Sequence, residues 1–124
     1  MTVTVDWDDA IEKKILCFTF IGEWTWFDCR QAFQNADDFA LDIEHAISHI
    51  YDFTNNRLPQ KTFHSYVQKL FGLRLHPFPK KTVVVERGHV VEMLRDVLAR
   101  QAQQPLDELH FAETLSRARA IIAS

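Results

Sequence analysis

The chain has 124 residues, and its 14 lysines and arginines against 17 aspartates and glutamates leave a formal net charge of −3. Apolar residues make up 47% and charged residues 25% of the sequence, which excludes a disordered chain and indicates one globular domain over residues 1–124. There is no apolar run of about 18 residues and no signal peptide at residues 1–9, so we expect a cytoplasmic protein without a transmembrane segment.

The first third of the chain predicts a hairpin followed by a helix. Val3 and Val5 alternate with polar residues as in a half-exposed strand, and residues 14–21 predict a second strand that pairs with it as an antiparallel hairpin. Thr25 and Asp28 fit a capping box at a helix start. We expect this helix to end near Leu41, with a core face made of Trp26, Cys29, Phe33, Ala36 and Ala40.

The middle of the chain predicts two strands with a helix between them. Residues 46–53 combine isoleucine, tyrosine and phenylalanine and precede a turn signal, so we interpret them as a strand, with a helix as the alternative. Pro59 suits the first turn of a helix whose apolar stripe is Phe63, Tyr66, Val67, Leu70 and Phe71. The continuous β-branched residues 82–85 indicate a strand that is buried on both faces, as in a parallel sheet.

The last third of the chain predicts a helix, a strand and a final helix. Residues 90–103 have the apolar period of a helix, and residues 109–112 form a short strand. Thr114 suits the N-cap of a last helix whose inward residues are Leu115, Ala118, Ile121 and Ile122. The element order ββαβαβαβα indicates an α/β fold with a mixed sheet and right-handed crossovers.

Residue types that carry chemistry form no recognised motif. The six histidines are scattered, and His45 with His49 lacks the glutamate of a metalloprotease helix. Cys17 and Cys29 lie in apolar contexts without CxxC spacing, and we interpret them as buried thiols. The second half of the chain is the more basic one, but its basic residues are scattered and no groove-reading motif is present. We expect no metal ion, no cofactor and no nucleic acid.

Two carboxylates could support acid–base catalysis. Asp52 and Glu86 lie at or near the ends of adjacent predicted strands, where open α/β sheets bind ligands. The alternative is that Asp52 caps the loop or helix that follows it. No nucleophile motif such as GxSxG is present. We therefore expect a protein that is not an enzyme, and an enzyme that uses these carboxylates is a further hypothesis.

Aromatic residues are numerous, with ten phenylalanines, three tryptophans and two tyrosines. A group of them near the first two helices could line a pocket for a lipid, or could pack in the single core that a chain of this size allows. This group is Trp24, Trp26, Phe27, Phe63, Tyr66 and Phe71. An apolar helical stripe could also contact a second subunit, so a homodimer is a further alternative.

Several short motifs resemble those of one protein family. The GEWTW segment at residues 22–26 resembles the start of that family's first helix. Residues 50–53 resemble its strand that ends in an aspartate, and residues 58–59 resemble the Leu-Pro pair that follows this strand. Residues 76–77 and residues 111–119 resemble two later motifs. The family is a small bacterial group similar to the STAS domains, which include the anti-sigma-factor antagonists and STAS/Sec14-like proteins. The resemblance spans nearly the whole chain and implies a STAS-like (SpoIIAA-like) fold.

The resemblance also implies a site, although the small group has no established activity. Signalling STAS proteins are phosphorylated on a D-S-[ST]-G-like loop that follows a core strand, and residues 52–62 correspond to it without that sequence. We expect a non-enzymatic interaction or regulatory module with a protein partner, and a small apolar or lipid ligand is the alternative. The expected contact residues are Asp52, Thr54, Asn55, Asn56, Arg57 and Thr62.

Overall fold

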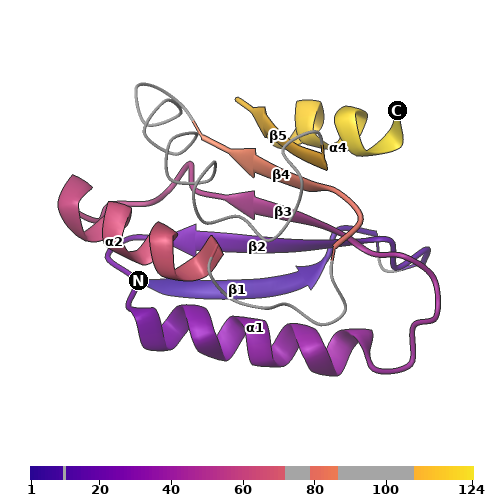
Figure 1. Ribbon diagram of the computed structural model, residues 1–124, viewed down its shortest axis with the longest axis horizontal. Coiled ribbons are helices and arrows are strands. Elements are labelled where there is room, and N and C mark those ends of the chain that lie inside the picture. The colour runs from indigo at the N-terminus through magenta and orange to yellow at the C-terminus, as the bar shows by residue number, and fades with distance from the viewer. Residues whose placement is uncertain (10, 72–78, 87–107) are drawn as a thin grey trace.

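Five strands form one sheet in the computed structural model, which describes residues 1–9, 11–71, 79–86 and 108–124 (Figure 1). The strands are β1 (Thr2–Trp7), β2 (Ile15–Ile21), β3 (Ser48–Asp52), β4 (Thr82–Val85) and β5 (Leu109–Ala112), and they lie in the sheet in this same order. β1 and β2 are antiparallel, whereas β3, β4 and β5 each run parallel to the strand before. The predicted α/β fold with an opening hairpin is therefore confirmed.

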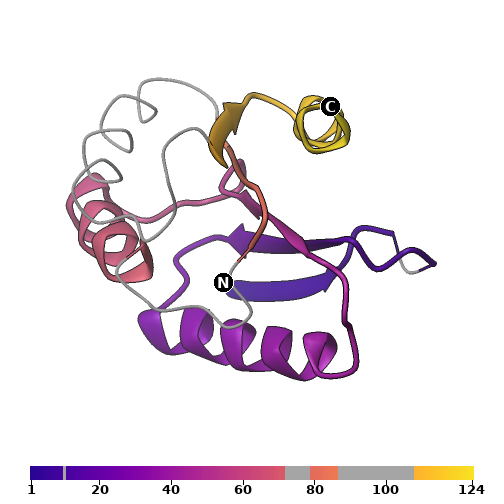
Figure 2. The same ribbon diagram turned by 45° about the vertical axis from the view of Figure 1, so that its right-hand side comes forward.

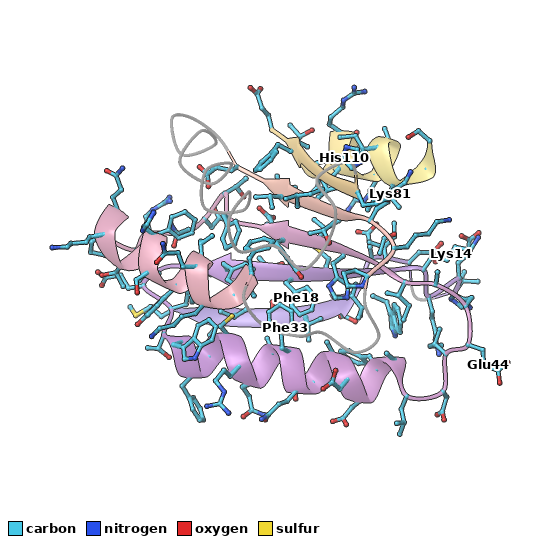
Figure 3. All side chains as sticks on the ribbon, in the orientation of Figure 1. Lys14, Phe18, Phe33, Glu44, Lys81 and His110 are labelled. Carbon is cyan, nitrogen blue, oxygen red and sulfur yellow. The ribbon has the colours of Figure 1, made fainter. Side chains whose placement is uncertain are left out.

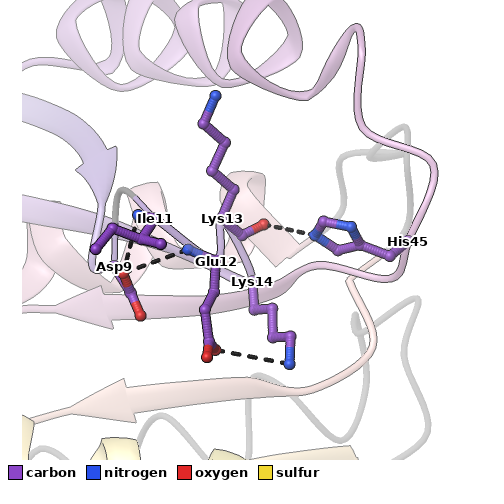
Figure 4. Close-up of polar contacts among 6 residues, drawn as sticks. All are labelled: Asp9, Ile11, Glu12, Lys13, Lys14 and His45. Atoms are coloured by element: carbon purple, nitrogen blue, oxygen red, sulfur yellow. Dashed lines mark hydrogen bonds and ion pairs between the residues drawn. The ribbon is translucent and has the colours of Figure 1, made fainter.

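The turn between β1 and β2 is held by hydrogen bonds of one aspartate (Figure 4). Asp9 Oδ1 accepts from the backbone N–H of Ile11 at 2.9 Å and of Glu12 at 3.4 Å, and its carbonyl accepts from the N–H of Lys13. Lys13 has φ 54°, a left-handed conformation that costs energy for a residue with a side chain. His45 Nε2 lies 2.9 Å from the Lys13 carbonyl oxygen and ties the turn to the segment before β3.

The described helices cover both faces of the sheet (Figure 2). α1 (Trp26–Ala40) and α2 (Gln60–Phe71) contribute Phe33 and Phe63 to a core on one face. α4 (Leu115–Ala123) packs Ala118 on the opposite face. Val84 belongs to the first core and Val83 to the second, so β4 is buried on both faces as predicted. No helix of the described part of the chain is long and apolar enough to cross a membrane.

The core face of α1 agrees with the sequence prediction except at its first residue. Cys29, Phe33, Ala36 and Ala40 are buried as predicted, together with Ala32. Trp26 lies at the start of the helix and is half-buried, with Lys69 Nζ 5.7 Å from its ring centroid in a cation–π arrangement. The helix predicted over residues 90–103 lies outside the described residues.

Charged side chains from opposite ends of the sequence fasten α4 to the sheet. Arg119 Nε and Nη2 donate to the Asp8 carboxylate at 2.9–3.1 Å, a bidentate pair that raises the pKa of Arg119. Lys81 Nζ donates to the carbonyl oxygens of Ser124 at 2.9 Å and Ile121 at 3.4 Å, which places a positive charge at the carboxyl end of α4. Asp8 near the amino end of the chain and Arg119 near its carboxyl end therefore form an ion pair.

The capping box at the start of α1 gives a first prediction. The N–H of Asp28 donates to Thr25 Oγ1 at 3.1 Å, and the N–H of Thr25 donates to Asp28 Oδ2 at 2.9 Å. Thr25→Ala should lower the free energy of unfolding by about 1 kcal/mol, because one backbone N–H of the first turn loses its acceptor. Urea denaturation measures the change. Thr25→Ser keeps the hydroxyl oxygen and should retain most of the stability, and an equal loss in both variants would contradict the role of that oxygen.

Candidate functional site

Asp52 ends β3 and organises the turn that follows it. The side chain is buried, and its Oδ1 accepts from the N–H of Thr54 at 3.0 Å and from the Thr54 hydroxyl at 2.7 Å. An aspartate whose side chain accepts from the backbone N–H two residues later forms an Asx turn, a local hydrogen bond that favours a change of chain direction. Of the two roles considered for Asp52, the side chain therefore has the structural one, in which it caps the loop that follows it.

The residues that follow the Asx turn are hydrogen-bonded to the backbone of Gly22, which comes directly after β2. The N–H of Gly22 donates to the Asn55 carbonyl, and the N–H of Arg57 donates to the Gly22 carbonyl, each at 2.9 Å. Gly22 has φ 68°, and a Cβ there would lie 2.8 Å from the backbone nitrogen of Met1, so the position favours glycine. These two hydrogen bonds fix the backbone of residues 54–57, which we call the β3–α2 loop, against the end of β2.

A buried tryptophan also holds the β3–α2 loop, through a side-chain hydrogen bond. Trp24 Nε1 donates to Asn56 Oδ1 at 2.9 Å, and the same oxygen lies 3.3 Å from the donating N–H of Leu58. Trp24 is 1% exposed and contacts the rings of Phe20 and Tyr66. The Asn56 side chain therefore holds the loop to the buried Trp24. No local sequence pattern indicated this role.

The candidate residues divide into supporting and exposed groups. Asp52 is buried, and Thr54 and Asn56 are half-buried and hydrogen-bonded, whereas Asn55 and Arg57 are exposed. Thr62 does not belong to the loop, since it lies within α2 and is half-buried. The structure thus brings the first five candidates together at the carboxyl ends of the parallel strands, with Asn55 and Arg57 as the side chains most open to a partner.

The Trp24–Asn56 hydrogen bond gives a second prediction. Asn56→Ala should lower the free energy of unfolding by about 1–3 kcal/mol, because it leaves the buried indole N–H of Trp24 without an acceptor. Urea denaturation followed by circular dichroism measures this loss. Asn56→Asp keeps an acceptor oxygen, and Asn55→Ala removes an exposed side chain, so both should stay closer to wild type. A loss from Asn55→Ala as large as that from Asn56→Ala would refute the assignment.

The two carboxylates considered for acid–base catalysis lie on opposite faces of the sheet. Both are buried, at 6% exposure for Asp52 and 8% for Glu86. Side chains alternate along a strand, so Asp52 shares the face of Ile50, which packs in the core under α4. Glu86 comes two residues after Val84, which packs in the core under α1 and α2. The sheet therefore separates the two groups and does not assemble the pair.

The described histidines and cysteines form no cluster suited to metal binding. Within residues 1–9, 11–71, 79–86 and 108–124, no three His, Cys, Asp or Glu side chains converge as ligands. Cys17 and Cys29 are free thiols, and burial raises the pKa of Cys17 to about 11 and that of Cys29 to about 12. Both therefore stay protonated and weakly nucleophilic near neutral pH.

A buried histidine–tyrosine pair lies on β3 and was not singled out from the sequence. His49 Nδ1 and the Tyr51 hydroxyl oxygen lie 3.1 Å apart, within hydrogen-bond distance. The centroid of the Phe18 ring lies 5.2 Å from that of the His49 ring and 5.4 Å from that of the Tyr51 ring. Burial lowers the pKa of His49 to about 3 and raises the pKa of Tyr51. The pair is a neutral polar element inside an aromatic core.

The aromatic residues considered for a lipid pocket mostly pack against one another. Trp24 and Phe63 are fully buried in the core, and Trp26, Tyr66 and Phe71 are partly buried against it. Ring centroids lie 5.2 Å apart for Trp24 and Tyr66 and 6.2 Å apart for Trp26 and Tyr66. The remaining member of the group, Phe27, points away from the core and is exposed. Core packing therefore accounts for five of the six residues.

The sheet order and the opening antiparallel hairpin are consistent with a SpoIIAA-like (STAS-like) fold. A similar solved structure is the crystal structure of an uncharacterised protein of the DUF3478 family from Shewanella loihica PV-4, which has a SpoIIAA-like fold. The two chains share 18% identity with a TM-score of 0.66, over 97% of this chain and 93% of the other. No family model matches the sequence, and no curated protein matches it. The likeness confirms the predicted fold.

Proposed function

We propose that this chain is a non-enzymatic protein-interaction module that contacts its partner through the β3–α2 loop. The pair of hydrogen bonds between Gly22 and the backbone of Asn55 and Arg57 carries this proposal, because it holds an exposed loop in one conformation. A surface that is already ordered loses little conformational entropy on binding. The neighbouring carboxylates Asp52 and Glu86 lie on different faces of the sheet, which favours binding over acid–base catalysis.

The chemistry of the exposed side chains indicates what they can contact. Asn55 offers amide donors and an acceptor, and Arg57 offers a guanidinium group, which pairs well with carboxylates and carbonyl oxygens. Arg57 Nη1 donates to the Asn56 carbonyl at 3.1 Å, which restrains the guanidinium near the loop. A protein surface that presents acidic side chains or free carbonyl groups would complement this arrangement.

Affinity capture with matched variants tests this function. Tagged wild-type protein, an Asn55→Ala/Arg57→Glu double variant and an Arg117→Glu control would be used to capture proteins from the cells that produce the chain. Arg117 is exposed on α4, on the opposite face of the sheet from α2, so its variant controls for a change of charge. We expect at least one partner that is captured by wild type and control and lost with the double variant. Identical partner sets, or no partner at all, would overturn the proposal.

A further inference from the structure

The outer side of α1 carries exposed apolar side chains at both of its ends. Figures 1 and 2 both place α1 at the outside of the molecule, with one side turned away from the sheet. Phe27 in the first turn is 73% exposed, and Leu41 at the C-cap is 80% exposed. Leu41 has φ −56° and ψ −41°, so its side chain continues the repeat of the helix. The two apolar groups are therefore available to a partner that lies along this side of the helix.

Five exposed residues of α1 and its C-cap are placed symmetrically about Gln34 in the sequence. An α-helix turns about 100° per residue, so residues four and seven positions apart lie near one another on the same face. Phe27 and Leu41 are each seven positions from Gln34, and Arg30 and Asp38 are each four positions from it. All five are exposed. The face therefore has an apolar group near each end, with a cation on one side of Gln34 and an anion on the other.

We propose that this face binds a second copy of the chain, with the two α1 helices antiparallel about a two-fold axis at Gln34. In this arrangement Phe27 of each copy lies opposite Leu41 of the other, and Arg30 of each copy lies opposite Asp38 of the other. A two-fold interface requires such self-complementary pairs, because every contact occurs twice. The interface therefore buries two Phe27–Leu41 pairs and forms two Arg30–Asp38 ion pairs.

The charges of α1 favour an antiparallel neighbour. Asp37 and Asp38 lie near the end of α1, its last turn has no basic residue, and the carboxyl end of a helix repels negative charge. Within the described residues, neither Arg30 nor Asp38 has an ion-pair partner in its own chain. An antiparallel second copy brings Arg30 and the positive amino end of its helix to these carboxylates. The dimer therefore corrects an electrostatic arrangement that is unfavourable in the monomer.

The expected dimer is a weak one. The 15 residues of α1 span about 22 Å. A contact along one helix is smaller than the standard protein interface of about 1,600 Å². We therefore expect a dissociation constant of about 10–100 µM, so the protein exchanges between monomer and dimer.

Two charge-reversal variants, measured alone and as a mixture, provide the decisive test. Sedimentation equilibrium from about 5 µM to about 500 µM brackets the expected dissociation constant. Arg30→Asp and Asp38→Arg should each raise that constant about tenfold or more, because each places like charges opposite one another at both ends. An equimolar mixture of the two variants should dimerise again. In that mixed pair, the introduced acid faces the introduced arginine, and the remaining Arg30 faces the remaining Asp38.

The mixing experiment also separates this interface from others. A wild-type protein that stays monomeric throughout, a dimer that is indifferent to both substitutions, or a mixture that fails to recover would each overturn the proposal. Leu41→Ser should weaken the dimer as well, whereas Ile11→Ser should not, since Ile11 is an exposed apolar residue of the β1–β2 turn. An equal loss in these two variants would indicate a contact outside α1.

Discussion

Replacing Phe18 with alanine is expected to lower the free energy of unfolding by about 3–5 kcal/mol. The Phe18 side chain is fully buried between β2 and α1. Its ring stacks on Phe33 with centroids 4.4 Å apart and meets the edge of the Tyr51 ring with centroids 5.4 Å apart. Figure 3 labels Phe18 and Phe33 where β2 and α1 face each other. Alanine removes these contacts and leaves a cavity that the neighbouring rings cannot fill without moving. Urea denaturation followed by circular dichroism measures the loss.

Phe27→Ala is the matched control for this experiment. It removes the same side chain from the exposed side of α1, so we expect a change within about 0.5 kcal/mol. The comparison should be made at low micromolar protein concentration, where the proposed dimer is dissociated. Equal destabilisation by the two variants would contradict the assignment of Phe18 to the centre of the core.

The stability of the protein is expected to decrease as the pH falls below about 6.5, because His49 must remain neutral in the core. Burial lowers the pKa of His49 from 6.5 to about 3 in the folded chain. Between these values the unfolded chain binds a proton at His49 that the folded chain does not bind, so protons favour unfolding. This single group contributes a slope of up to about 1.4 kcal/mol per pH unit. Urea denaturation at several pH values from about 7.5 down to about 5 measures the slope.

Two glutamine variants isolate the contribution of His49. His49→Gln removes the titrating ring, so its free energy of unfolding should depend less on pH than that of wild type in the same window. His64→Gln replaces a half-buried histidine of α2 and is the control for the loss of a histidine outside β3. Parallel pH profiles for wild type and His49→Gln would show that another group carries the effect.

The order and type of the described elements could be predicted because each has a local signal. The alternation around Val3 and Val5, the β-branched residues 82–85 and the capping pair Thr25 and Asp28 each correspond to a strand or helix start in the structure. Boundaries were less accurate, since the strand predicted over residues 46–53 is Ser48–Asp52. Strand ends depend on pairing with neighbours, which a local pattern does not record.

The sequence indicated where the loop after β3 begins, but not the contacts that hold it in place. The turn signal after β3 located the loop, but its anchors come from residues far away in the chain. Trp24 and Asn56 are 32 positions apart, and Gly22 meets Asn55 because β2 and β3 are neighbours in the sheet. The faces of Asp52 and Glu86 likewise depend on strand register. Pairings of this kind become visible only when the sheet is assembled.

The strand order of the sheet has a consequence for how the protein is made. Each described strand from β2 onward hydrogen-bonds to the strand that precedes it in the chain, so no strand is inserted between two earlier ones. A chain that leaves the ribosome amino end first can therefore form the β1–β2 hairpin and add each later strand to an edge that is already exposed. Synthesis and sheet growth can proceed in the same direction, and the growing sheet offers one productive edge to each strand as it emerges.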